Sequence, residues 1–156
     1  MTPPERVADA LRRAGLPDRL VAFESSTGTA PEAAASVGCS LGQIVKSLYF
    51  SADGRPTVVL VAGDRHADTA RLAELLGVPR KKLAMGSAAE VEAVTGYAVG
   101  GVAPVGHLAP CDIVADESLR RFETVFAAAG DSHTVFEAEP EDLVARVGGQ
   151  WAAITR

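Results

Sequence analysis

Residues 44–62 decide the fold and read IVKSLYFSADGRPTVVLVA. The runs from Ile44 to Ser51 and from Thr57 to Ala62 are rich in β-branched and aromatic side chains, which is typical of strands. The segment Asp53-Gly54-Arg55-Pro56 separates them, and an Asp-Gly pair favours a tight turn. This stretch therefore predicts a β-hairpin.

The segments on either side of the hairpin switch between helical and strand patterns. Helices are expected over residues 5–14, 29–38, 68–77, 87–94 and 141–147, and further strands over residues 20–23, 113–115, 124–128, 134–138 and 151–154. Thr29, Asp68 and Ser87 are candidate N-caps, and Glu90 follows Ser87 at capping-box spacing. The irregular order favours a mixed-sheet α/β or α+β fold, in one compact domain over residues 1–156.

The composition is that of a folded globular protein, with 47% hydrophobic and 22% charged residues. The net charge of −5 argues against binding to duplex DNA, because such proteins present a basic face. No apolar stretch approaches the about 18 residues of a membrane helix, and no signal peptide is recognisable. These features predict a cytoplasmic protein without a membrane partner, in which Cys39 and Cys111 are buried free thiols.

Lys46 is the one charged residue in the largely apolar run from Ile44 to Ser51. Side chains alternate between the faces of a strand, so Lys46 shares a face with Ile44, Leu48 and Phe50. It is either an edge-strand lysine whose ammonium reaches water, or a point charge in a cleft that holds a phosphate or a polarised carbonyl. The residues alone leave both interpretations open.

A second candidate feature is the loop from Thr95 to His107, which reads TGYAVGGVAPVGH. Glycines let a ligand approach the backbone closely, and a row of them can present N–H groups to an anion or an oxyanion. A structural Ω-loop is the alternative. The loop lacks the GK[ST] ending of a nucleotide-binding P-loop.

The remaining reactive side chains form no catalytic pattern. His107 could act as a general base by residue type, but a lone histidine beside an apolar loop favours a hydrogen-bonded structural role. His66 and His133 lie in polar turns and are expected to be exposed. No GxSxG motif and no cluster of metal ligands is present, so neither a triad, a metal site nor a cofactor is predicted. The basic run Arg80-Lys81-Lys82 is either a solvated face or a local contact for a phosphate backbone.

Three segments together resemble one family. QIVKSL at residues 43–48, TGYxVGGVxPVGH at residues 95–107 and the segment from Phe126 to Val147 are similar, in order and spacing, to the YbaK/ProX family. This family comprises aminoacyl-tRNA deacylases that also occur as the editing domain of bacterial prolyl-tRNA synthetases. The resemblance extends over nearly the whole chain, from Glu5 to Ile154.

The resemblance implies a compact α/β fold around a mixed, barrel-like sheet flanked by helices, with a pocket beside the lysine strand and the glycine-rich loop. It implies that Lys46 is the functional lysine and that Gly100 and Gly101 supply backbone groups to the reacting ester. Six residues are expected to contact the substrate, namely Phe23, Ser47, Val99, Pro104, His107 and Val135.

The activity that the resemblance implies is hydrolysis, in trans, of the ester bond in a mischarged tRNA. Apolar residues in the pocket favour a small amino acid such as alanine or cysteine on tRNA(Pro). Val135 stands where relatives specialised for Cys-tRNA(Pro) carry an acidic residue, which counts against cysteine. The expected partners are the aminoacylated acceptor end and an aminoacyl-tRNA synthetase. The alternatives are a non-catalytic binding module for a tRNA end or nucleotide, and a small-molecule esterase.

Overall fold

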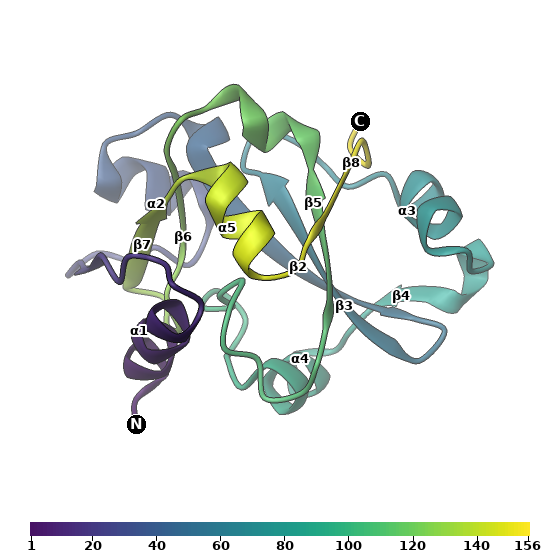
Figure 1. Cartoon of the computed structure of the whole chain (residues 1–156), viewed down its shortest axis with the longest axis horizontal. Coiled ribbons are helices and arrows are strands. Elements are labelled where there is room, and N and C mark those ends of the chain that lie inside the picture. The colour runs from purple at the N-terminus through teal and green to yellow at the C-terminus, as the bar shows by residue number, and fades with distance from the viewer.

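The computed structural model describes all residues from 1 to 156 (Figure 1). The helices are α1 (Pro3–Arg13), α2 (Ala30–Val37), α3 (Thr69–Leu76), α4 (Ala88–Thr95) and α5 (Pro140–Arg146). The strands are β1 (Leu20–Ala22), β2 (Ile44–Ala52), β3 (Arg55–Ala62), β4 (Leu83–Met85), β5 (Asp112–Asp116), β6 (Val125–Ala128), β7 (Thr134–Ala138) and β8 (Gln150–Ala152). Three 3₁₀ helices are η1 (Leu41–Gln43), η2 (Arg80–Lys82) and η3 (Glu117–Arg121). None of the helices is both long enough and apolar enough to cross a membrane.

All the helices and strands predicted from the sequence are present, and the helix caps explain where the helices begin. The side chains of Thr29, Asp68 and Ser87 each accept a hydrogen bond from a backbone N–H in the first turn of their helix. The predicted capping box of α4 is only half formed, because Ser87 accepts from the Glu90 N–H but the Glu90 side chain does not return a bond. The short strand β4 has no clear pattern in the sequence and is an addition.

The central hairpin is tighter than the sequence suggests. Arg55 already pairs with Ala52, so only Asp53 and Gly54 form the turn. Both have a positive φ, 51° and 85°, which is the backbone conformation of a two-residue turn that matches the twist of the strands. Asp and Gly are among the residues that adopt it at least cost.

The eight strands form one mixed sheet, which confirms the predicted fold class. Their order is β1-β7-β6-β2-β3-β5-β8, and β4 pairs with β2 beside this path. The pairs β2–β6, β3–β5 and β5–β8 are parallel, and the others are antiparallel. The hairpin β2–β3 thus lies in the middle of the sheet.

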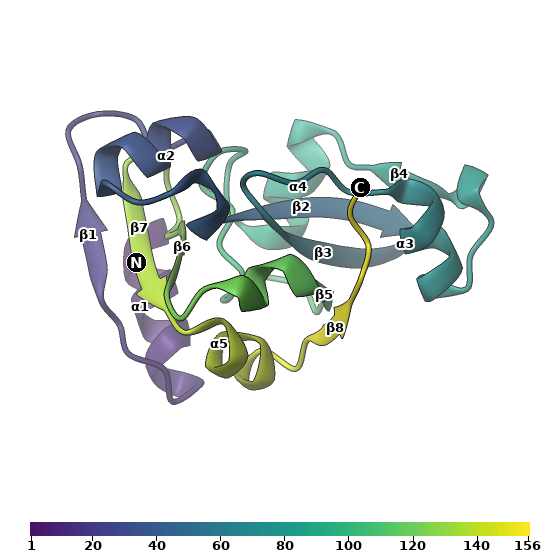
Figure 2. The same ribbon diagram turned by 90° about the horizontal axis from the view of Figure 1, so that it is seen from above.

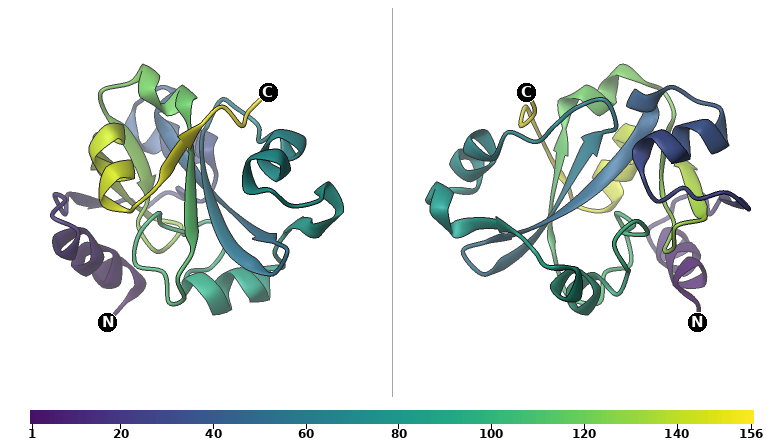
Figure 3. Two further views of the ribbon diagram at one scale, coloured as in Figure 1. Left: turned by 45° about the vertical axis from the view of Figure 1, so that its right-hand side comes forward. Right: turned by 180° about the vertical axis from the view of Figure 1, so that it is seen from behind.

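Helices cover both faces of the sheet, and the alternation along β2 shows which residues face which layer. Val45 and Tyr49 belong to the main core, together with side chains from α1, α4 and α5. Phe50 packs with α3, and Ile44 packs with α2. Figure 2 shows α2 and α5 on opposite sides of the hairpin, and the left view of Figure 3 shows α3 and α5 on opposite sides of it. Lys46, which shares a face with Ile44 and Phe50, therefore belongs to the α2–α3 side.

One side of β2 is interrupted. From Val45 to Ala52, β2 pairs with β3. On its other side it pairs with β6 only at Ile44 and Val45, and with β4 only from Phe50 onward. Residues 46–49 therefore have no strand beside them on that side, and this gap in the sheet positions the candidate site.

Both cysteines are free, as expected, but they are partly exposed rather than buried. Each lies at the end of an element, where chain packing is looser. Cys39 follows the Gly38 cap of α2, and Cys111 precedes β5.

Candidate active site

A cavity of about 450 Å³ opens at the gap in the sheet. Its walls come from β2, from α2 and the loop before it, from β6, from Met85 and Gly86 after β4, and from the glycine-rich loop. The volume falls within the range of about 300–1,000 Å³ that is usual for small-molecule sites. Fourteen of the 21 lining residues are hydrophobic, so the cavity favours an apolar group over a charged side chain.

Lys46 lines this cavity from β2, a central strand of the sheet that is open on one side at residues 46–49. Its Nζ donates a hydrogen bond to the backbone carbonyl of Arg65, at 2.5 Å. Burial lowers the pKa of the Lys46 ammonium below its ordinary value, and the nearby Asp64 carboxylate opposes this shift. No ion pair of Lys46 is present, so its charge is available to a ligand.

The glycine-rich loop brings residues with unused backbone amides to the same cavity. Gly100 lines the cavity with a φ of 94°, and its N–H donates to no protein acceptor. The Gly101 N–H, in contrast, already donates to the Ala98 carbonyl at 3.0 Å, and Gly101 does not line the cavity. Val102, which the sequence reasoning missed, also lines it with an unpaired N–H.

Two hydroxyls in the cavity wall have no partner. Ser47 lies in the gap of β2, and its Oγ makes no hydrogen bond with the protein although it is buried. Thr27 Oγ1 is likewise buried and makes no hydrogen bond with the protein, and Thr27 is only 4% exposed. A buried hydroxyl without a partner costs about 1–3 kcal/mol, so such groups in a cavity wall call for an explanation.

Five of the nine residues predicted for the site line this cavity. They are Lys46, Ser47, Val99, Gly100 and Val135. Val99 is 67% exposed and lies at the rim, whereas Val135 is buried in the wall.

The structure places the other predicted residues outside the cavity. Phe23 directly follows β1, which lies at the edge of the sheet, and its N–H donates to His133. Pro104 and His107 line a separate, smaller cavity because the loop turns there toward α1 and α5. His107 Nε2 lies 2.7 Å from the Ala103 carbonyl, and burial lowers the pKa of this imidazole, which fits a structural role.

The α2 side of the cavity is absent from the sequence-based site. Thr27, Gly28, Thr29, Ala30 and Ala33 all line it. The only signal for them in the sequence was the polar loop before the helix. Gly100 packs directly on this loop, since a Cβ on Gly100 would lie 3.4 Å from the Gly28 carbonyl oxygen.

With this geometry in hand, comparison with known proteins identifies the family. The model of the aminoacyl-tRNA editing domain matches residues 24–145, which include all the cavity walls. The chain belongs to the aminoacyl-tRNA editing domain family. This confirms the resemblance found in the sequence and the class of enzyme that it implied, an aminoacyl-tRNA deacylase.

Individual relatives of this editing domain agree with that assignment. It is 38% identical over 122 residues to "Uncharacterized protein YwhH" of Bacillus subtilis, covering 78% of this chain and 76% of that one. It is 30% identical over 128 residues to "Putative Cys-tRNA(Pro)/Cys-tRNA(Cys) deacylase EbsC" of Enterococcus faecalis, covering 81% and 77%. The crystal structure of "a putative trans-editing enzyme for prolyl tRNA synthetase" matches with a TM-score of 0.92 and 38% identity, over 100% of this chain and 98% of that one.

Proposed function

We propose that this editing domain acts in trans on tRNA(Pro) charged with a small amino acid, and hydrolyses the ester bond. The observation that carries the proposal is the cavity in the sheet gap, which has the Lys46 side chain and the unpaired Gly100 amide in its wall. The aminoacyl group and the terminal ribose would occupy the cavity, and the rest of the tRNA would remain outside.

The chemistry requires stabilisation of charge more than a strong base. Attack of water on the ester carbonyl places negative charge on the carbonyl oxygen, and the C–O bond to the ribose then breaks. The Gly100 N–H would donate to this oxygen, and Lys46 would hold the terminal phosphate or ribose in register. The proton from water would pass to solvent or to the leaving ribose oxygen. No histidine lines the cavity, and this route needs none.

The walls of the cavity favour a small, uncharged amino acid. Ala33, Ala127 and Ala128 contribute little bulk, and the buried Val135 presents only methyl groups. An apolar pocket of this kind separates substrates that differ by one methylene by about 1–3 kcal/mol. Alanine therefore fits the walls best.

The position of the basic run on η2 supports a contact with the acceptor strand. Arg80, Lys81 and Lys82 are exposed, and none of them forms an ion pair. Lys82 directly precedes β4, whose last residue, Met85, lines the cavity. Three residues of strand span about 10 Å, which matches about three stacked nucleotides.

Changing Arg80, Lys81 and Lys82 together to Gln is expected to raise KM for aminoacyl-tRNA while leaving kcat close to that of the wild type. The salt dependence of tRNA binding should weaken by a slope of about 2, since each lost phosphate contact on a single strand removes about 0.7. Binding titrations at several salt concentrations measure this slope. The control is Arg12→Gln/Arg13→Gln, because both arginines pair with acids of their own on or beside α1. An unchanged slope in the η2 variant would exclude this surface.

The function itself is tested by a deacylation panel. The purified protein is incubated with tRNA(Pro) carrying alanine, cysteine, serine or proline, and loss of the ester is followed over time. Rapid loss of one mischarged species with Pro-tRNA(Pro) spared supports trans-editing and names the amino acid. A binding module would instead slow the spontaneous loss, and an esterase would cleave simple amino acid esters as rapidly as aminoacyl-tRNA.

A further inference from the structure

Lys46 is held beside an acidic residue with which it does not pair. Its Nζ donates to the carbonyl of Arg65, and the preceding residue is Asp64. Asp64 is close enough to influence the Lys46 ammonium electrostatically. An ammonium normally prefers a carboxylate to a neutral carbonyl, because hydrogen bonds between charged groups are stronger. The arrangement therefore needs a reason why Asp64 is not the partner of Lys46.

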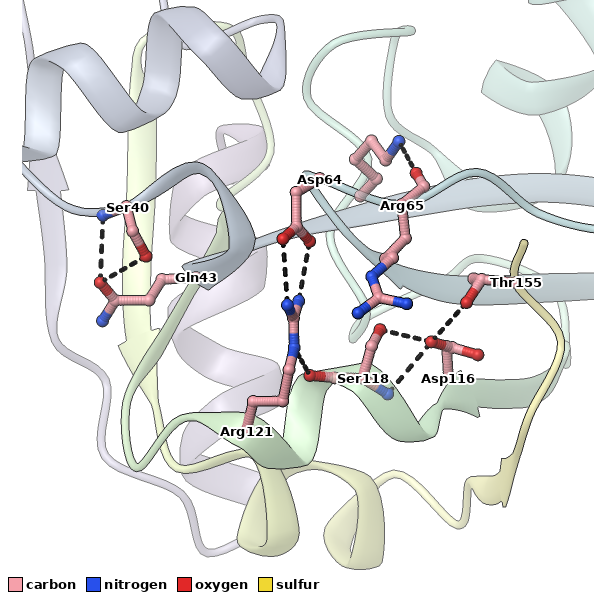
Figure 4. A network of polar contacts seen from close by, with 9 residues as sticks. Ser40, Gln43, Asp64, Arg65, Asp116, Ser118, Arg121 and Thr155 are labelled. Carbon is pink, nitrogen blue, oxygen red and sulfur yellow. Dashed lines mark hydrogen bonds and ion pairs between the residues drawn. The ribbon is translucent and has the colours of Figure 1, made fainter.

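The reason is a competing cation from η3. The Arg121 guanidinium donates hydrogen bonds to both carboxylate oxygens of Asp64, with Nη2 at 2.7 Å from Oδ1 and Nη1 at 3.0 Å from Oδ2 (Figure 4). A bidentate pair of this kind fixes the direction of the carboxylate as well as its charge. The hydrogen bonds from Arg121 hold the pKa of Asp64 below its ordinary value, so the carboxylate stays ionised and paired.

The Arg121 side chain is itself held in place by other contacts of η3. Its Nε donates to the Ser118 carbonyl at 2.7 Å, and its guanidinium lies over the Phe122 ring at 4.9 Å. Ser118 is in turn bound through its N–H and its hydroxyl to the carboxylate of Asp116, which is only 2% exposed. Asp116 also accepts from the Ile154 N–H at 2.9 Å. The η3 helix thus presents Arg121 from a rigid support, which Figure 4 shows beside Asp64.

We propose that Arg121 is a positioning residue that sequesters the Asp64 carboxylate, and so keeps Lys46 unpaired and available to the substrate. This rests on the proposed function of Lys46. Without Arg121, Asp64 turns to Lys46, neutralises its charge and draws the side chain from the cavity. Neither Asp64 nor Arg121 lines the cavity, so their effect on the reaction passes through Lys46.

The test is a pair of single variants and their combination. Arg121→Gln is expected to lower kcat/KM at least about tenfold, because it frees a carboxylate that can pair with Lys46. Asp64→Asn should stay close to the wild type, since it removes the competitor. The double variant Asp64→Asn/Arg121→Gln should recover most of the activity, which is a non-additive result that reports direct coupling. The matched control is Arg120→Gln, which breaks a neighbouring surface ion pair with Glu141.

Two patterns contradict the proposal. If the double variant is as slow as Arg121→Gln, Asp64 is not what disables Lys46. If Asp64→Asn alone is as slow as Arg121→Gln, the ion pair only braces the fold. Thermal unfolding of each variant shows whether lost activity follows lost stability, since a bracing role alone would lower the two together.

A second readout needs no tRNA and separates this inference from the proposed function. Lys46 is acylated with a small amine-reactive anhydride, and its modification is measured by mass spectrometry against Lys81 and Lys82 in the same chain. A carboxylate partner raises the pKa of the ammonium, so Lys46 reactivity should fall about tenfold or more in Arg121→Gln and return in the double variant. Unchanged reactivity in Arg121→Gln overturns the proposal, whatever the deacylation panel shows.

Discussion

Replacing Lys46 by alanine is expected to lower kcat/KM for deacylation by about 100-fold, because a displacement of about 1 Å of the reacting groups can lower a rate about 100-fold. Lys46 is the cationic side chain in the cavity wall, and it forms no ion pair with the rest of the protein. Without it, the terminal phosphate or ribose loses its anchor, and the ester carbonyl is no longer held against the Gly100 amide.

The fold should survive this change. Lys46 is half-buried and makes one hydrogen bond, whose net contribution to the free energy of unfolding is about 1 kcal/mol. For a chain of this size that corresponds to a drop in Tm of about 2–4 °C. Lys46→Met is the matched control, because it keeps the packing of the stem without the charge. Near-wild-type deacylation by either variant, on the species that the panel identifies, would refute the role given to Lys46.

The sequence predicts the elements of this fold well because their signals are local. Asp53-Gly54 specifies a turn with two positive φ angles, and Asp68 specifies the start of α3 through hydrogen bonds to its own first turn. The short strand β4 has no such signal. It exists because Phe50, Ser51 and Ala52 offer an unpaired strand edge to a segment more than 30 residues later in the chain.

The candidate site was predicted where the chain itself carries unusual chemistry, as at Lys46 and Gly100. The sequence did not reveal the parts of the site where common residues reach the cavity only through tertiary packing. Thr27 is one polar residue in a polar loop until tertiary packing buries its hydroxyl beside the cavity. The gap beside β2 is likewise a property of strand order, since it depends on β6 ending its pairing at Val45 and β4 beginning at Phe50. No local pattern encodes either fact.

The second large effect is expected at Gly101, for a steric reason. A Cβ at this position would lie 2.6 Å from Asp131 Cα and 2.8 Å from Asp131 N, and these backbone atoms cannot rotate away. The same segment is bound from Gly130 N–H to the Gly101 carbonyl at 3.0 Å. Gly101→Ala must therefore push the glycine-rich loop away from the strand pair β6–β7. Overpacking of this kind costs about 1–3 kcal/mol of stability.

The cost to activity should be larger than the cost to stability, because the shift reaches the neighbouring Gly100. A displacement of about 1 Å in a group that contacts the reacting atoms can lower the rate about 100-fold. Gly54→Ala provides the control, because its φ of 85° also opposes a side chain but nothing lies within 4 Å of the added Cβ. Forcing alanine into that conformation costs about 1–2 kcal/mol, at a turn that does not line the cavity.

Both glycine variants should then lose comparable stability in thermal unfolding, while only Gly101→Ala loses deacylation at a temperature where both are folded. If the two variants keep the same activity, the position of the Gly100 amide does not limit the reaction, and the oxyanion must be stabilised elsewhere. Val102 lies on the other side of Gly101 and also lines the cavity without a protein acceptor, so the same shift would displace its amide as well. Full activity in Gly101→Ala, combined with a lowered Tm, would therefore argue against both the Gly100 and the Val102 amide as the donor that limits the reaction.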